Sequence, residues 1–208
     1  MMSVRLARPW LTVDLAGSSR ALSFAPYRPG DVACDQIIWR EVRDADLTET
    51  FDAVGWLAAE VAPAEAVAML TSRNVERHLH RRVEVGSVVA EAVVTIGLSN
   101  AERVGFRRGV TGGVGTINVA VAVSAGLTMA ARIEAMTIAA SARTAAVLDA
   151  SVEIESGLAT GTGTDCIVVV SPEGACSFAG MHTEVGEAIG AVVYSAVSDG
   201  VAHWLAER

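Results

Sequence analysis

One short segment combines glycines, threonines and an aspartate directly in front of an apolar run. It reads Gly161-Thr162-Gly163-Thr164-Asp165, and residues 166–170 follow it as a predicted buried strand. Glycines let backbone amides approach a ligand closely, and threonines add hydroxyl donors. A carboxylate at the mouth of a buried strand is costly unless it has a partner. Asp165 is therefore predicted to be a general base, a metal ligand or a substrate acceptor, or else to hold the loop by accepting backbone amides.

A histidine and a threonine stand just before the last predicted helix. The start of a helix offers free backbone N–H groups and the positive end of its dipole. His182 is a candidate acid or base, although a lone histidine more often has a structural role. Thr183 is a candidate helix cap and a candidate substrate ligand. Because His182 follows Asp165 closely in the sequence, the two are expected to share one sheet edge.

Two asparagines lie near the ends of predicted strands. Asn100 follows the strand predicted over 88–98, and Asn118 lies at the head of the strand predicted over 116–123. Their side-chain amides suit the binding of amide or carbonyl groups of a ligand. The alternative is ordinary turn chemistry, which also favours asparagine.

The positive charges limit the chemistry further. All sixteen Lys and Arg residues are arginine, so a lysine Schiff base, a P-loop lysine and Ser-Lys amidase machinery are excluded. Arg73, Arg77 and Arg81 are four residues apart, which predicts a helical stripe. That stripe is either a solvated face or a rim that holds an anionic group. The histidines and cysteines lack paired zinc spacing, and a metal site formed by His182, Glu187 and Asp165 is a minor alternative.

The pattern of apolar residues predicts an α+β fold. Hairpin-like strands fill residues 1–45, and strands alternate with long helices over residues 66–208, the part that carries the motifs. A turn at Gly17 is expected to divide residues 10–26 into a hairpin. A short strand is expected over 177–179. We predict a single domain over 1–208 with a mixed, largely antiparallel sheet that carries packed helices.

Composition narrows the class of protein. Of the 208 residues 51% are apolar, and the net charge of −8 argues against binding to nucleic acid. Three cysteines without paired spacing and no apparent secretory signal indicate reduced thiols and a cytoplasmic protein. Residues 109–131 carry no charge, but glycine turns interrupt them, so no membrane span is expected. The long alanine- and glycine-rich helices suit either a homodimer or a buried core.

The motifs taken together resemble one family. The run 159–170, the run 179–190 and the upstream segments 95–101 and 115–118 resemble the adenosylcobinamide amidohydrolase family in order and spacing. The resemblance covers roughly Met69 to the C-terminus. It implies hydrolysis of the amide that joins aminopropanol to the corrin ring of adenosylcobinamide, giving adenosylcobyric acid for cobalamin salvage. It also implies that cobalt belongs to the substrate, and no further cofactor is predicted; the need for a metal stays open.

Within that resemblance, the residues suggest roles. Asp165 or His182 would activate water, while the loop amides or the last helix N-terminus would hold the oxyanion. Asn100 and Asn118 would bind substrate amides. The residues that would contact substrate are Asn100, Asn118, Gly161, Thr162, Gly163, Thr164 and Thr183. Three alternatives remain: a threonine nucleophile freed by cleavage at Gly115-Thr116, a corrinoid-binding module without catalysis, and a purely structural subunit.

Overall fold

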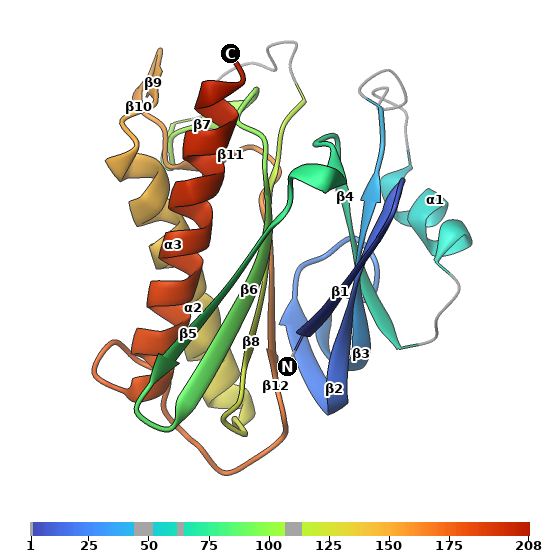
Figure 1. Ribbon diagram of the computed structural model, residues 1–208, viewed down its shortest axis with the longest axis vertical. Coiled ribbons are helices and arrows are strands. Elements are labelled where there is room, and N and C mark those ends of the chain that lie inside the picture. Colours follow the sequence, from blue (N-terminus) through green and yellow to red (C-terminus); the bar gives the residue numbers. More distant parts are fainter. Residues whose placement is uncertain (1, 44–51, 62–64, 107–113) are drawn as a thin grey trace.

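The computed structural model describes residues 2–43, 52–61, 65–106 and 114–208, in which strands and helices are mixed along the chain (Figure 1). The longer strands are β1 (Met2–Ala7), β2 (Trp10–Ser23), β3 (Gly30–Glu41), β4 (Ala66–Thr71), β5 (Leu79–Val85), β6 (Val88–Ile96), β8 (Ile117–Val123) and β12 (Cys166–Ser171). Two-residue strands are β7 (Ala101–Glu102), β9 (Glu153–Ile154), β10 (Gly157–Leu158) and β11 (Gly161–Thr162). The helices are α1 (Ala53–Glu60), α2 (Met129–Asp149) and α3 (Glu184–Ala206), with a 3₁₀ turn η2 (Val75–Arg77).

Eight strands form one mixed sheet. Its order is β4-β3-β2-β12-β8-β6-β5, with β1 paired to β2. The pairs β3–β4 and β8–β12 are parallel, and the remaining pairs are antiparallel. The predicted α+β class with a mixed, largely antiparallel sheet is confirmed. Strands from both the N-terminal part and the motif-bearing part of the chain contribute to it.

The sheet folds over on itself, so that its two halves face each other. One buried cluster joins Leu11, Ile37 and Met69 from β2, β3 and β4 to Val93 and Val168 from β6 and β12. A second cluster packs α2 and α3 on the opposite face of β6, β8 and β12. A third, smaller cluster lies between α1 and the outer face of β3 and β4. Figure 1 shows the resulting layers, with α2 and α3 on one side and α1 on the other.

The N-terminal hairpin is not where the sequence predicted it. Gly17 adopts a positive φ of 83°, but β2 continues through it as one strand whose register with β3 shifts between Asp14 and Ser19. Such an irregularity inserts extra residues and bends a strand without ending it. The hairpin that forms is β1–β2, with Pro9 between the two strands. The expectation of a turn at Gly17 is therefore wrong.

The basic segment after β4 is not a helix. Only the 3₁₀ turn η2 forms there, and β5 alternates half-buried and exposed residues as a strand does. Arg73 and Arg77 both pair with Glu207, at 2.7 and 3.4 Å, and Arg81 pairs with Asp199 at 2.8 Å. The predicted stripe is thus neutralised by carboxylates at the end of the chain, and it does not form an anion-binding rim.

Two long helices form, as the sequence predicted, but a short strand that was expected between them does not. Thr183 caps α3, as expected, and Thr128 caps α2. The short strand expected over 177–179 is absent from the described structure, where the segment is irregular. The described part of the uncharged stretch, 114–131, contributes β8 and the start of α2. By length and composition α3 could cross a membrane, but 56% of its apolar window is buried in the fold, as in a core helix.

Candidate active site

The chain gathers most of its motif residues at one edge of the sheet. Because β8 and β12 are parallel neighbours, with Asn118 opposite Cys166, they begin at the same edge. The segments that lead into them, 114–116 and 160–165, therefore lie side by side. The strand β7 pairs with β11 in the same region, so that Glu102 lies opposite Gly161. This edge lies towards the top of Figure 1, where β7 and β11 are labelled.

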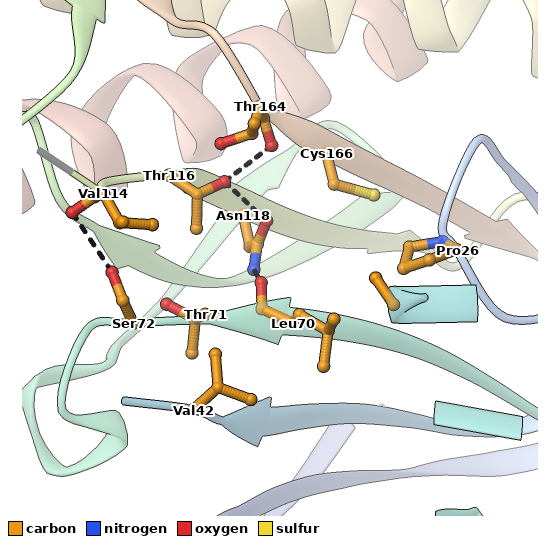
Figure 2. Close-up of a pocket in the computed structure, with 11 residues that line it drawn as sticks. Pro26, Val42, Leu70, Thr71, Ser72, Val114, Thr116, Asn118, Thr164 and Cys166 are labelled. Atoms are coloured by element: carbon orange, nitrogen blue, oxygen red, sulfur yellow. Dashed lines mark hydrogen bonds between the residues drawn. The ribbon is translucent and has the colours of Figure 1, made fainter. Parts of the chain in front are cut away.

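A cavity of about 300 Å³ opens at this edge, between the two halves of the sheet. Figure 2 shows residues of β4 and β8 and the start of β12 around it. The lining residues are Pro26, Val42, Ala53, Leu70, Thr71, Ser72, Val114, Thr116, Asn118, Thr164 and Cys166. Its walls combine apolar side chains with hydroxyl and amide groups. Small-molecule pockets usually have this composition, and this volume is at the lower end of their range.

Asn118 connects the two halves of the sheet across the cavity. Its Nδ2 donates to the carbonyl of Leu70 on β4 at 2.7 Å (Figure 2). The hydroxyl of Thr116 lies 2.6 Å from the carbonyl of Thr164 and 3.3 Å from Asn118 Oδ1. A hydroxyl has one proton, and the shorter contact is the stronger one. Asn118 Oδ1 therefore keeps capacity to accept a hydrogen bond from a ligand.

Thr71 offers the complementary group. It is 1% exposed, and its Oγ1 accepts the backbone N–H of Arg73 at 3.0 Å. Among the described residues no acceptor is in reach of its hydroxyl proton. Its neighbour Ser72 differs, since its hydroxyl donates to the carbonyl of Val114 at 3.2 Å. Thr71 and Asn118 both line the cavity, so this donor and the acceptor of Asn118 border the same space.

Cys166 also lines the cavity, but as an unreactive thiol. It is 6% exposed, and burial raises the pKa of its thiol to about 12. A thiol with that pKa is protonated at neutral pH, and the thiolate is the nucleophilic form. Cys166 belongs to the buried core, and its neighbour Asp165 does not line the cavity.

Asp165 faces away from the cavity and has its oxygens occupied. Oδ2 accepts the backbone N–H of Thr162 at 3.0 Å, and Oδ1 accepts that of Ile117 at 3.1 Å. The hydroxyl of Thr162 and the guanidinium of Arg143 on α2 make two further short contacts. Of the roles that the sequence left open, this geometry favours the loop-holding carboxylate, because a general base needs a free oxygen beside the substrate.

Arg143 was missed as a functional candidate. Its side chain is 17% exposed, and burial lowers its pKa from the ordinary arginine value. It is one of few charged residues in an alanine-rich helix. A charge on a helix that reads as largely buried indicates an ion-pair partner, and this signal could have identified it.

The Gly/Thr segment separates the cavity from a second hollow of about 350 Å³, which we call the outer hollow. Thr164 faces the cavity, whereas Gly161, Thr162, Gly163 and Asp165 line the outer hollow. The other residues that line it are Phe24, Glu102, Arg103, Val104, Arg143, Thr144 and Thr160. A Cβ on Gly161 would lie 2.1 Å from Arg143 Nη1, so this position requires glycine.

Asn100 lies beside this segment and lines neither hollow. Its Oδ1 is buried without a hydrogen-bond partner among the described residues. A Cβ on Gly115 would lie 2.9 Å from that oxygen, and a Cβ on Gly163 would lie 3.8 Å from Nδ2. The structure thus brings Asn100 to the same edge as Asn118, between the loops that precede β8 and β12.

His182 and Thr183 lie at the other end of the sheet. The six residues of β12 carry the chain about 20 Å from the Gly/Thr segment before it turns towards α3. Thr183 Oγ1 accepts Gly186 N at 3.0 Å and donates to the Gly180 carbonyl at 2.8 Å, while His182 is exposed. The expectation that His182 and Asp165 share an edge is wrong, because one strand crosses the whole sheet between them. A metal site formed by both is excluded for the same reason.

No three His, Cys, Asp or Glu side chains in the described ranges gather as metal ligands would. A comparison with protein families matches residues 2–208 to the family described as adenosylcobinamide amidohydrolase (CbiZ). The chain belongs to this family. None of the curated proteins compared with it gave a match. The family match extends the resemblance seen from Met69 onward to nearly the entire chain, which fits the contribution of Pro26 and Val42 to the cavity wall.

Proposed function

We propose that the protein hydrolyses the amide that joins aminopropanol to the propionyl side chain of the corrin ring in adenosylcobinamide. The products would be adenosylcobyric acid and aminopropanol, and the acid would re-enter cobalamin synthesis. Membership of the adenosylcobinamide amidohydrolase family supports the activity in general terms. The cobalt ion belongs to the substrate.

The observation that carries this proposal is the pair of unfilled hydrogen-bonding groups in the cavity. An amide offers one carbonyl acceptor and one N–H donor. Thr71 has a free hydroxyl proton and Asn118 Oδ1 has a free lone pair. Thr71 would donate to the scissile carbonyl, and Asn118 would accept the amide N–H.

The cavity volume suits one side chain of a corrinoid. About 300 Å³ is at the lower end for small-molecule pockets, so the aminopropanol arm would enter while the macrocycle stays outside.

Hydrolysis then requires water to attack the carbonyl carbon. The C–N bond breaks, the hydroxyl of water stays on the acyl group, and a proton goes to the leaving amine. Negative charge develops on the carbonyl oxygen, where a positioned donor such as the Thr71 hydroxyl stabilises it. Asp165 and Arg143 would hold the Gly/Thr segment and the start of β8 in place.

Two further expectations stay with this proposal. We propose no cofactor besides the cobalt of the substrate, and the need for a resident metal is tested by measuring activity after dialysis against a chelator. We also propose a cytoplasmic location. The three cysteines are unpaired, and Cys34 and Cys166 are buried thiols.

The proposal is tested by incubating the purified protein with adenosylcobinamide and separating the products by chromatography. We expect adenosylcobyric acid and free aminopropanol in equal amounts. A change in the corrinoid absorption spectrum without the acid product would show a binding module and overturn the proposed hydrolysis.

A further inference from the structure

The outer hollow has a composition that the cleavage of an amide arm does not require. We propose that it binds the adenosyl group of the substrate, as a subsite for an uncharged nucleoside. This inference rests on the proposed function. The same Gly/Thr segment forms one wall of the cavity and one wall of the outer hollow, so one ligand can contact both.

The charges around the outer hollow favour an uncharged ligand. Two arginines, Arg103 and Arg143, line it together with two carboxylates, Glu102 and Asp165. Among the described residues that line it the formal charges cancel, and Arg143 already pairs with Asp165. A phosphate or carboxylate group would therefore find no net attraction there, whereas adenine and ribose are neutral.

The exposed apolar surface favours a planar aromatic group. Phe24 is 56% exposed and Val104 is 77% exposed, and both line the outer hollow. The guanidinium of Arg103 lies 5.8 Å from the centre of the Phe106 ring. Aromatic rings and guanidinium planes are the surfaces on which nucleobases stack.

One buried donor remains for a polar atom of the ligand. Nε of Arg143 is buried and has no hydrogen-bond acceptor among the described residues. An unmade hydrogen bond at a buried guanidinium is costly. A ring nitrogen of adenine or an oxygen of ribose would satisfy it. The volume of about 350 Å³ suits a group of nucleoside size and excludes the macrocycle.

The test compares two substrates that differ only in the upper ligand of cobalt. KM and kcat are measured for adenosylcobinamide and for cobinamide that carries cyanide in place of the adenosyl group. The variants are Phe24→Ala and, as the matched control, Phe178→Ala, which removes an even more exposed ring (71%) outside the outer hollow. We expect Phe24→Ala to raise KM for adenosylcobinamide about tenfold and to leave KM for the cyanide form unchanged. Phe178→Ala should change neither.

Calorimetric titration with free adenosine separates this inference from the proposed function. We expect a binding signal with the wild type that is lost in Phe24→Ala, whether or not the protein cleaves an amide. If Phe24→Ala affects both substrates equally or neither, or if the wild type does not bind adenosine, the subsite is disproved. Adenosine binding that depends on Phe24, without cleavage of either substrate, would leave the subsite standing and refute the hydrolase.

Discussion

The two ends of the half-sheet formed by β12, β8, β6 and β5 use similar residue types in opposite ways. At the end where β8 and β12 begin, Thr71 and Asn118 retain unused hydrogen-bonding capacity. At the end where α3 begins, Thr183 both donates and accepts, and Glu184 accepts the N–H and hydroxyl of Ser87, each at 3.2 Å. Groups that are fully used within the fold stabilise it, and unused buried groups indicate where a ligand binds. From this comparison we infer that the reaction takes place at the end where β8 and β12 begin.

Substitution of Thr71 tests the end of the sheet where β8 and β12 begin, and it should have the largest effect on kcat. Thr71→Val removes the hydroxyl that would donate to the scissile carbonyl. Loss of one such donor lowers kcat by about a hundredfold. Steady-state hydrolysis of adenosylcobinamide measures it, with circular dichroism to confirm folding.

Two matched variants keep this test specific. Thr71→Ser retains the hydroxyl and should keep most of the activity. Ser72→Ala removes a neighbouring hydroxyl that is already bonded to Val114, and it should leave kcat within severalfold of wild type. Near-normal turnover in Thr71→Val would refute the donor role.

We expect substitution of Asp165 to act mainly on the stability of the fold and not directly on the hydrolysis step. Removing one charge of a mostly buried ion pair leaves the other uncompensated, and such changes cost about 3 kcal/mol. Because Asp165 also accepts the backbone N–H groups of Thr162 and Ile117, we expect Asp165→Asn to lower the free energy of unfolding in urea by about that amount.

Asp199→Asn is the matched control for that change. It breaks an exposed pair with Arg81 and should cost less than about 1 kcal/mol. If Asp165→Asn kept wild-type stability but lost all activity, Asp165 would be a catalytic group after all.

The sequence predicted local features better than long-range ones. The Thr183 cap of α3 follows from residue types next to one another, and this prediction is confirmed. The parallel pairing of β8 with β12, which brings Asn118 beside Cys166, requires knowledge of sheet order. Sequence distance misled for His182, because the 16 residues between it and Asp165 include a strand that crosses the sheet.

The cavity could not be predicted as a whole for a related reason. Thr71 ends β4 and Val42 follows β3, both outside the recognised motifs, and they reach the site only because the sheet folds over on itself. Gly161, in contrast, can be recognised in the sequence as part of the Gly/Thr segment. It leaves space for Arg143, although that partner is only evident from the structure.

Substitution of Thr183 tests the other end of the sheet. Thr183→Ala removes the cap of α3, and loss of a threonine cap costs about 1 kcal/mol. We expect a lower midpoint in urea and unchanged kcat. His182→Ala should leave both values unchanged, since its side chain is exposed and remote from the cavity. A fall of tenfold or more in kcat for either variant would contradict the division between the two ends.

The smallest effect is expected for Cys166, a residue that lines the cavity without being reactive. In the unfolded chain a thiol loses its proton near pH 9, whereas burial raises the pKa of Cys166 to about 12 in the folded protein. The folded state therefore retains the proton longer, and stability that is complete below pH 9 falls as the pH rises towards 12. Between pH 9 and 10 the wild type should lose about 1 kcal/mol more than Cys166→Ala. Cys34→Ala should show a similar reduction of the slope, because burial raises the pKa of Cys34 to about 11. Urea unfolding at the two pH values measures the difference, and equal slopes in the wild type and Cys166→Ala would show that the thiol ionises freely in the cavity.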